Sequence, residues 1–214
     1  LKDWKVTDTP CTWSNVTCEG GHVTGLQIGG YQLAGTIPAG FGNLNRLKLL
    51  SLTHDQLNGS IPAELGNLSN LESLDLDNNQ LSGSIPAELG SLSSLQRLSL
   101  NNNLLSGSFP AELGNLDSLI DLNVANNPLS GSLPLGLTNL THLSGLYFIS
   151  TGLCIPDNTT FLDWLSSRYV VGTGITCGSG SYSISGTVLD TGGSPMAGVT
   201  VTTGTGYMVI TDAD

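Results

Sequence analysis

Basic residues are scarce in this chain of 214 residues. Lysine and arginine number 6 against 17 acidic residues, which gives a formal net charge of -11, and only 11% of all residues are charged. Binding to nucleic acid or to an anionic membrane surface needs clustered basic side chains, so both functions are disfavoured. The basic residues are instead scattered along the chain, at Lys2, Lys5, Arg46, Lys48, Arg97 and Arg168.

Long apolar runs and catalytic motifs are also missing. No apolar run approaches the roughly 20 residues of a membrane-spanning helix, and no secretion signal is visible, so we interpret the chain as a mature or trimmed form. The histidines His22, His54 and His142 lack a metal-binding spacing, and neither a glycine-rich phosphate loop nor a nucleophile elbow occurs. A catalytic group of Ser51, His54 and Asp75 is conceivable, but a surface histidine among many serines is the simpler explanation. We therefore expect no enzyme activity and no cofactor.

Leucine, by contrast, returns every 24 residues without an insertion or deletion. The complete unit is clearest in LESLDLDNNQLSGSIPAELGSLSS, residues 71–94. A fixed period of this length is typical of a solenoid, in which each coil buries its apolar edge against the next. The six units begin at Val23, Leu47, Leu71, Leu95, Leu119 and Leu143.

The two halves of each unit predict different local structures. The first half reads Leu-x-x-Leu-x-Leu, as in Leu71, Leu74 and Leu76, and predicts a short strand with one buried face. The second half reads Leu-x-Gly-x-Ile-Pro, and its proline has no N–H to give to the middle of a sheet. We therefore predict an α/β solenoid, a curved right-handed superhelix with a parallel concave β-sheet and short convex strands or 3₁₀ segments.

A polar column follows the predicted strands. An inward-facing Asn amide at this position can donate to turn carbonyls that the strand ladder leaves bare. Because an unpaired buried polar group costs about 1–3 kcal/mol, Asn79, Asn103 and Asn127 are expected to form a structural ladder that satisfies the turns. The column runs Tyr31, Asp55, Asn79, Asn103, Asn127, Thr151 and departs from Asn at both ends, which suits terminal coils.

Four cysteines allow three pairings, and the solenoid decides between them. Coils stacked about 4.8 Å apart place the two ends of the repeats roughly 24 Å apart, whereas a disulfide needs Cα atoms within about 7 Å. We therefore expect Cys11–Cys18 and Cys154–Cys177, one bridge at each end, rather than a metal cluster. Paired cysteines indicate an oxidising compartment, so the protein is expected to be secreted or on the cell surface.

This pattern resembles the plant-type leucine-rich repeat, LxxLxLxxNx followed by LxGxIPxxLxxLxxL, over residues 23–153. Its flanks are similar to the disulfide-bonded caps of that family, WKVTDTPCTWSNVTCEGGHVTGLQI (4–28) and LCIPDNTTFLDWLSSRYVVGTGITC (153–177). In the second cap, Phe161, Trp164 and Leu165 have the spacing of one helix face. The resemblance implies an extracellular recognition domain, since receptor ectodomains and inhibitors of wall-degrading enzymes are roles of this family.

The carboxy-terminal tail has a different pattern. Gly-Ser-Gly-Ser at 178–181 has the composition of a linker, and residues 182–214 resemble the opening strands of the carboxypeptidase-regulatory-like β-sandwich module. These 33 residues are too few for an independent sandwich, so we interpret them as its truncated start. Such modules are common in bacterial secreted proteins, and the resemblance therefore hints at a bacterial origin. The expected organisation is an amino-terminal cap (1–22), six repeats (23–153), a carboxy-terminal cap (154–177), a linker (178–181) and the truncated module (182–214).

Polar side chains gather on the predicted concave face of the middle coils. Two coil spacings bring these strand residues within roughly 10 Å of one another, where they would suit a basic peptide, a polyol or glycan, or a cation. Any solvated sheet face also carries polar residues. The candidate ligand-binding residues are Asp75, Asp77, Arg97, Asn101, Asp121 and Asn123, with Tyr147 near the carboxy end.

The sequence favours a non-catalytic extracellular module that binds a protein or peptide ligand on the concave face. Two alternatives stay open. A carbohydrate- or ice-binding surface is suggested by the regular Asn, Ser and Thr residues, and glycan binding or thermal hysteresis would reveal it. A structural spacer of a modular cell-surface protein is suggested by the tail, and its concave residues would tolerate free substitution.

Overall fold

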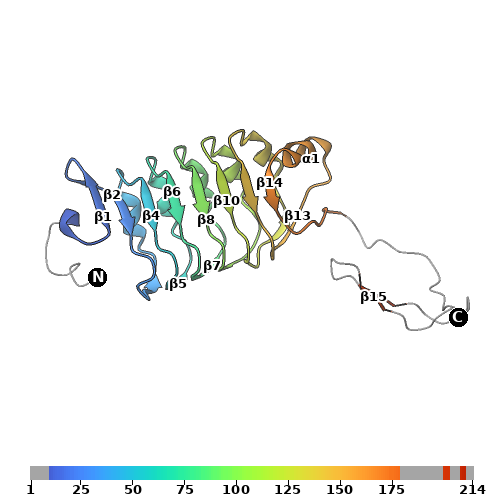
Figure 1. Ribbon diagram of the computed structural model, residues 1–214, viewed down its shortest axis with the longest axis horizontal. Coiled ribbons are helices and arrows are strands. Elements are labelled where there is room, and N and C mark those ends of the chain that lie inside the picture. Colours follow the sequence, from blue (N-terminus) through green and yellow to red (C-terminus); the bar gives the residue numbers. More distant parts are fainter. Residues whose placement is uncertain (1–9, 179–199, 203–207, 211–214) are drawn as a thin grey trace, which may run out of the picture. The chain divides into compact units, whose positions relative to one another are not determined.

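The computed structural model describes residues 10–178, 200–202 and 208–210. The chain divides into two compact units, Leu1–Cys177 and Gly178–Asp214, and each is described by itself. The first unit is a row of stacked coils with a cap at each end (Figure 1). Residues 1–9 of the expected amino-terminal cap lie outside the described residues.

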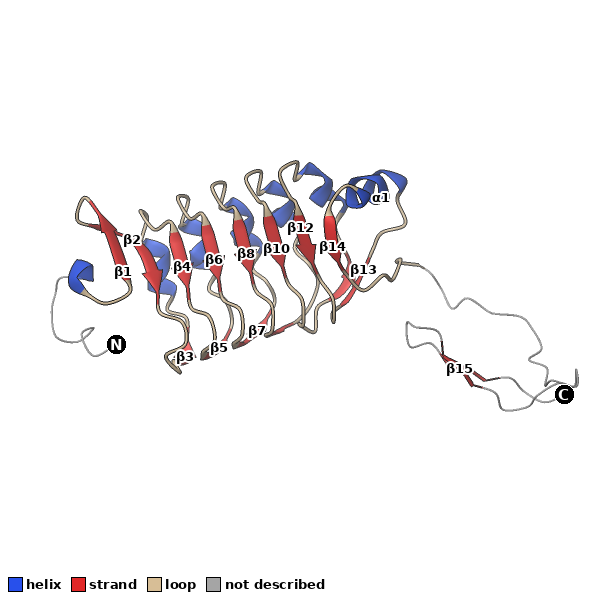
Figure 2. Cartoon of the chain, in the orientation of Figure 1, coloured by secondary structure: helices blue, strands red, loops and turns tan. Residues whose placement is uncertain are grey.

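The first unit is organised around one eight-stranded sheet. Its inner strands pair in parallel and in register, so that Leu50, Leu74 and Leu98 are direct neighbours at intervals of one repeat. Figure 2 shows these strands side by side in one layer, with the 3₁₀ helices behind them. The strands are, in spatial order, β1 (Val16–Glu19), β2 (His22–Gln27), β4 (Leu49–Ser51), β6 (Ser73–Asp75), β8 (Arg97–Ser99), β10 (Asp121–Asn123), β12 (Gly145–Tyr147) and β14 (Tyr169–Val171).

The second half of each repeat forms a short second strand and a 3₁₀ helix. The second strands are β3 (Ala34–Thr36), β5 (Gln56–Gly59), β7 (Gln80–Gly83) and β9 (Leu104–Leu105) in one sheet, and β11 (Ser130–Ser132) with β13 (Gly152–Cys154) in another. The 3₁₀ helices are η1 (Pro10–Thr12) in the cap, then η2 (Ala39–Asn43), η3 (Ala63–Asn67), η4 (Ala87–Ser91), η5 (Ala111–Asn115) and η6 (Leu135–Asn139). Each repeat proline immediately precedes its 3₁₀ helix, where a missing N–H costs nothing. The predicted solenoid is thereby confirmed.

The leucines of successive coils make one continuous core. In the third coil Leu71, Leu74, Leu76 and Leu89 are all 0% exposed, and their equivalents in the neighbouring coils are buried in the same way. Burying one such side chain contributes about 1.5–3 kcal/mol, so the inner coils are held mainly by contact with their neighbours.

The amino-terminal cap closes the stack with a strand that the repeat pattern did not predict. Strand β1 pairs antiparallel with β2, and Cys11 is bonded to Cys18 as expected. The main sheet is therefore parallel except at this first strand. The antiparallel hairpin covers the edge of the first coil, which would otherwise expose unpaired backbone groups.

The carboxy-terminal cap combines a helix, a strand and a disulfide. Helix α1 (Thr159–Ser166) begins after Asn158, whose side chain accepts a hydrogen bond from the Phe161 N–H at 2.9 Å. Phe161 is fully buried, and Trp164 and Leu165 pack against the core, as their spacing predicted.

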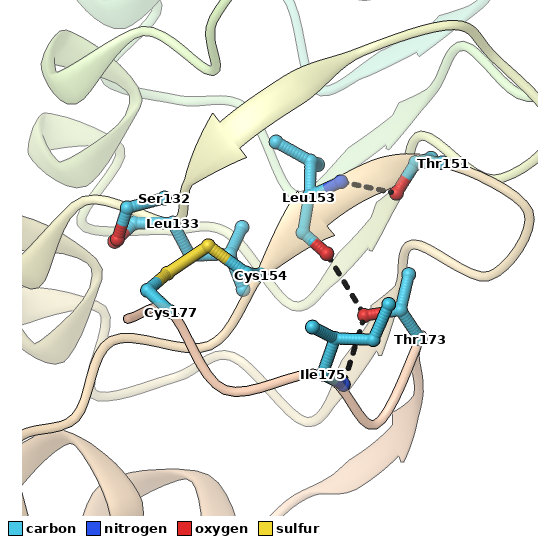
Figure 3. Close-up of a disulfide and its surroundings, with 8 residues drawn as sticks. All are labelled: Ser132, Leu133, Thr151, Leu153, Cys154, Thr173, Ile175 and Cys177. Atoms are coloured by element: carbon cyan, nitrogen blue, oxygen red, sulfur yellow. Dashed lines mark hydrogen bonds between the residues drawn. A yellow bond between two sulfur atoms is a disulfide. The ribbon is translucent and has the colours of Figure 1, made fainter. Parts of the chain in front are cut away.

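The polypeptide after α1 is tied back to the last coil. Cys154 is bonded to Cys177, and the Thr173 hydroxyl next to this bridge donates to the Leu153 carbonyl at 2.8 Å (Figure 3). Arg168 lies 4.2 Å from the centre of the Trp164 ring and donates to the Leu140 carbonyl at 3.1 Å. These contacts hold β14 in register as the last strand of the main sheet.

The second unit is described only in part. Strands β15 (Thr200–Thr202) and β16 (Met208–Ile210) pair antiparallel, with Val201 opposite Val209. Most of the expected linker (178–181) and of the expected β-sandwich start (182–214) lies outside the described residues. Both assignments therefore remain predictions.

Candidate ligand-binding face

Strand register places five of the seven candidate residues in two rows on the concave face. Leu74, Leu98 and Leu122 point into the core, so the residues on either side of them face outward. One row is Ser73, Arg97, Asp121, Gly145 and Tyr169, and the other is Asp75, Ser99, Asn123, Tyr147 and Val171. Asp77 and Asn101 follow two residues after the ends of their strands, at the carboxyl edge of the sheet.

Asp75 lies at the centre of a polar chain across two strands. The Ser73 hydroxyl donates to its carboxylate at 3.1 Å, and the Arg97 guanidinium donates to that hydroxyl at 3.4 Å. Burial raises the pKa of Asp75, and the neighbouring Asp77 adds to this effect, whereas the Ser73 hydrogen bond and the Arg97 charge act in the opposite direction. The ionised carboxylate is therefore incompletely compensated, and a cationic ligand group would stabilise it.

Asp77 is held by two groups at the carboxyl edge. The Asn78 side chain donates to its carboxylate at 2.6 Å, and the His54 Nδ1 lies 3.8 Å away. Within residues 10–178, His54 has this contact and none with Ser51 or Asp75, so the conceivable catalytic group is not assembled.

A second Asn ladder, which the sequence analysis missed, runs along this edge. The Asn102 amide donates to Asn78 at 3.0 Å, and the Asn126 amide donates to Asn102 at 2.6 Å. All three residues have φ between 54° and 56°, a left-handed conformation that Asn tolerates better than most residues. The doubled Asn in the three inner repeats was the available signal, since one Asn turns inward and the other lies at the edge.

The two amide candidates are each fixed by a bond within their own coil. Asn101 accepts a hydrogen bond from the Ser99 hydroxyl at 2.8 Å, and Asn123 accepts one from the Ala125 N–H at 3.1 Å. Their free hydrogen-bonding groups are thus held in defined directions on short, rigid strands, which is the arrangement that a binding surface needs.

The inner Asn residues bridge neighbouring coils. The Asn103 amide donates to the Leu76 and Leu100 carbonyls at 3.0 and 3.1 Å, and its Oδ1 accepts from the Leu81 N–H at 3.0 Å. Asn79 and Asn127 make the equivalent bonds. Each side chain satisfies backbone groups of both its own coil and the preceding one.

The column changes at Asp55, where only half of this pattern is possible. One carboxylate oxygen accepts from the Tyr31 and Leu33 N–H groups, both at 2.9 Å, but the other oxygen is buried without a hydrogen-bond donor. An amide at that position would be a donor facing turn carbonyls. Tyr31, by contrast, points outward and accepts from the Asn15 side chain at 2.7 Å.

We expect Asp55→Asn to stabilise the protein by about 1–2 kcal/mol, because it replaces a buried acceptor without a donor by an amide that can donate. Urea unfolding monitored by circular dichroism at neutral pH measures this change. The converse substitution, Asn127→Asp, should destabilise by a similar amount. An Asp55→Asn protein with unchanged or lower stability contradicts this account of the column.

Within the three described ranges, no three His, Cys, Asp or Glu side chains are grouped so as to hold a metal ion. An open groove of about 600 Å³ lies between the second strands and the 3₁₀ helices, lined in part by Ser60, Ser84 and Ser108 on one side and Glu88 and Glu112 on the other. The longest helix in the described part, α1, has eight residues and cannot cross a bilayer.

Stacked 24-residue coils, a parallel concave sheet and an inner Asn ladder together define a leucine-rich repeat solenoid. A family model described as a leucine-rich repeat region matches residues 26–166. The chain belongs to the leucine-rich repeat proteins.

Its relatives include plant receptor kinases. A segment of 51 residues is 53% identical to "Probable inactive receptor kinase RLK902" of Arabidopsis thaliana and covers 23% of this chain. A similar segment is 49% identical to a second inactive kinase, At1g48480, and each match spans only 8% of the relative's length.

Similar solved structures are ectodomains of Arabidopsis thaliana receptors. The receptor kinase HAESA, in complex with the peptide hormone IDA and the co-receptor SERK1, is 33% identical with a TM-score of 0.70, covering 80% of this chain and 29% of HAESA. The BIR3–SERK2 complex gives 35% identity and a TM-score of 0.64, covering 72% of this chain and 85% of the matched chain. These similarities support the plant-type assignment of the repeat.

Proposed function

We propose that this chain is a non-catalytic, extracellular recognition module that binds a peptide or a protein segment on its concave sheet. The observation that carries the proposal is the main sheet, whose parallel strands from β2 to β14 pair in register and present charged and polar side chains on one face. Solenoids commonly use such extended concave surfaces for binding. Solved relatives with the same fold include receptors in complex with peptide hormones.

The centre of the proposed site lies on β6 to β10. Asp75 and Asp77 supply carboxylates, Arg97 supplies the one basic side chain of the two rows, and Asn101 and Asn123 supply oriented amides. Asp121 and Tyr147 extend the site toward the carboxy-terminal cap. An extended peptide lying across the strands would meet these side chains in succession.

An oxidising compartment is part of the same proposal. Both disulfides join residues at the ends of the stack, and within the described residues no cysteine is free. Structural disulfides of this kind persist outside the reducing cytosol, so we place the protein outside the cell or on its surface.

Simultaneous replacement of the central charges is expected to abolish ligand binding without unfolding the stack. Peptides selected from a displayed random library on the wild-type chain should lose about 100-fold in affinity for Asp75→Asn/Asp77→Asn/Arg97→Gln, because three charged contacts are removed together. Isothermal titration calorimetry measures the affinity, and thermal unfolding checks the fold.

A matched triple variant changes the net charge equally on the outer side: Glu88→Gln/Glu112→Gln/Arg46→Gln, where all three residues are exposed. It should bind as the wild type does. If the triple variant of the concave face keeps its affinity for the peptides, the binding site lies elsewhere on the chain. A library from which no peptide is enriched would instead favour the structural spacer.

A further inference from the structure

The carboxy-terminal end of the concave face contains a cluster that the inner coils lack. Gly145, in the first row, is buried because neighbouring side chains pack over it. A Cβ atom placed on Gly145 would stand 2.5 Å from the Asp121 carboxylate and 2.9 Å from the Tyr147 ring. The carboxylate and the ring therefore lie against the same small space.

Tyr169 adds a second aromatic face beside this space. It is the register partner of Gly145 on β14, it is 65% exposed, and its ring centroid lies 5.8 Å from that of Tyr147 at a tilt of 56°. Two aromatic rings and one carboxylate are thus grouped around Gly145 at this end of the concave face.

The carboxylate of Asp121 is not neutralised by the protein. Within residues 10–178 the ion pairs are Lys48–Glu19 and the His54–Asp77 contact. Arg97, on the adjacent strand, donates to Ser73 on its other side. With a net charge of -11, the chain also attracts cations from a distance.

We propose that Asp121, Tyr147 and Tyr169 form a subsite for a cationic side chain, an arginine of the bound peptide. Carboxylates pair with guanidinium groups through two parallel hydrogen bonds, and aromatic faces attract cations through their quadrupole. Arginine fits better than lysine because its planar head can stack on a ring while its N–H groups reach the carboxylate. Within residues 10–178, Arg168 lies over the Trp164 ring in a contact of this kind. The inference rests on the proposed peptide-binding function and names the ligand chemistry at one end of its site.

The test uses the full chain, labelled with ¹⁵N, and N-acetyl-L-arginine amide as the probe. Titration followed by NMR should show saturable shifts centred on β10, β12 and β14. N-acetyl-L-citrulline amide, which has the same shape without the charge, should bind at least about fivefold more weakly, as expected for loss of an exposed cation–π contact and ion pair.

Variants separate the contributions of the two kinds of group. Asp121→Asn and Tyr169→Ala should each weaken arginine binding about fivefold, whereas Tyr169→Phe should retain it because the ring is kept. Asp117→Asn removes an exposed carboxylate four residues before Asp121, at the end of the preceding repeat, and should leave binding unchanged.

Equal binding of the arginine and citrulline probes would overturn the subsite, as would unchanged affinity in both Asp121→Asn and Tyr169→Ala. Failure of the arginine probe to bind would overturn it as well. The peptide library tests the proposed function independently of this subsite. If the subsite is wrong but the function is right, peptides without a basic residue are still selected, and these peptides lose affinity for the central triple variant.

Discussion

Replacing Asn103 with Leu is expected to lower the free energy of unfolding by about 4 kcal/mol, which would make it one of the two most damaging single changes considered for this chain. Its amide is 5% exposed and bonds to carbonyls of two coils, and its oxygen accepts from the Leu81 N–H. Leucine has a similar size but makes none of these hydrogen bonds. The Leu81 N–H would lose its acceptor, and the Leu76 and Leu100 carbonyls would each lose one of two amide donors, because the neighbouring ladder residues also donate to them. Urea unfolding measures the loss, and hydrogen exchange should show it first in the third and fourth coils.

Asn115→Leu is the matched control for this substitution. Asn115 ends the 3₁₀ helix of the same repeat, and its side chain is exposed. The same chemical change should alter stability there by less than about 0.5 kcal/mol. Similar losses of unfolding free energy in both variants would show that an Asn of the inner ladder contributes no more to stability than an exposed Asn does.

The second large effect is expected from Gly90→Ala, which should destabilise by about 3 kcal/mol because it forces two backbones apart. A Cβ on Gly90 would lie 2.3 Å from the Glu112 carbonyl oxygen of the next coil. That obstacle is backbone, which cannot rotate away as a side chain can. Gly66 and Gly114 make equivalent close approaches, at 2.4 and 2.6 Å, so the glycine sets how closely the 3₁₀ helices stack.

Gly40→Ala gives the comparison within another 3₁₀ helix. A Cβ there would meet no atom within 4 Å, so alanine should be neutral or slightly stabilising. Thermal unfolding of both variants distinguishes a packing effect from a general preference for glycine in these segments. A Gly90→Ala protein as stable as the wild type would contradict this account, because it would mean that adjacent 3₁₀ helices can move apart without a loss of stability.

The inner Asn and the 3₁₀ glycine act on opposite sides of each coil. The first satisfies backbone groups that the sheet leaves unpaired, and the second allows helices to approach at the spacing the sheet imposes. A change on either side disturbs the contact between neighbours, which is where a solenoid has most of its stability. This coupling gives a physical reason for the constant length of the repeat over the inner coils.

The repeat pattern predicted the fold because it is local and periodic. The leucine positions identify the buried face of every strand, and proline marks where the second strand gives way to a 3₁₀ helix. The disulfide pairing followed from the same geometry, since the two ends of a stack cannot meet. The caps were less predictable: β1 pairs antiparallel and β14 joins the main sheet without any leucine-repeat signal.

The candidate site also combines positions that the repeat predicted with one that it did not. The columns of Asp75, Arg97 and Asp121 follow directly from the period, because residues one repeat apart are register partners. Tyr169 could not be placed in this way, since it follows a helix in the cap and belongs to no repeat.

The order of residues alone determined the solenoid, its concave strands and the pairing of its cysteines, because a strict period forces each coil to meet its neighbour in the same way. Only the tertiary structure decided that Tyr169 stands beside Tyr147, and that Arg97 turns toward Ser73 and leaves Asp121 without a cation. These arrangements depend on side-chain directions and on how an irregular cap folds back, and a repeating pattern contains neither.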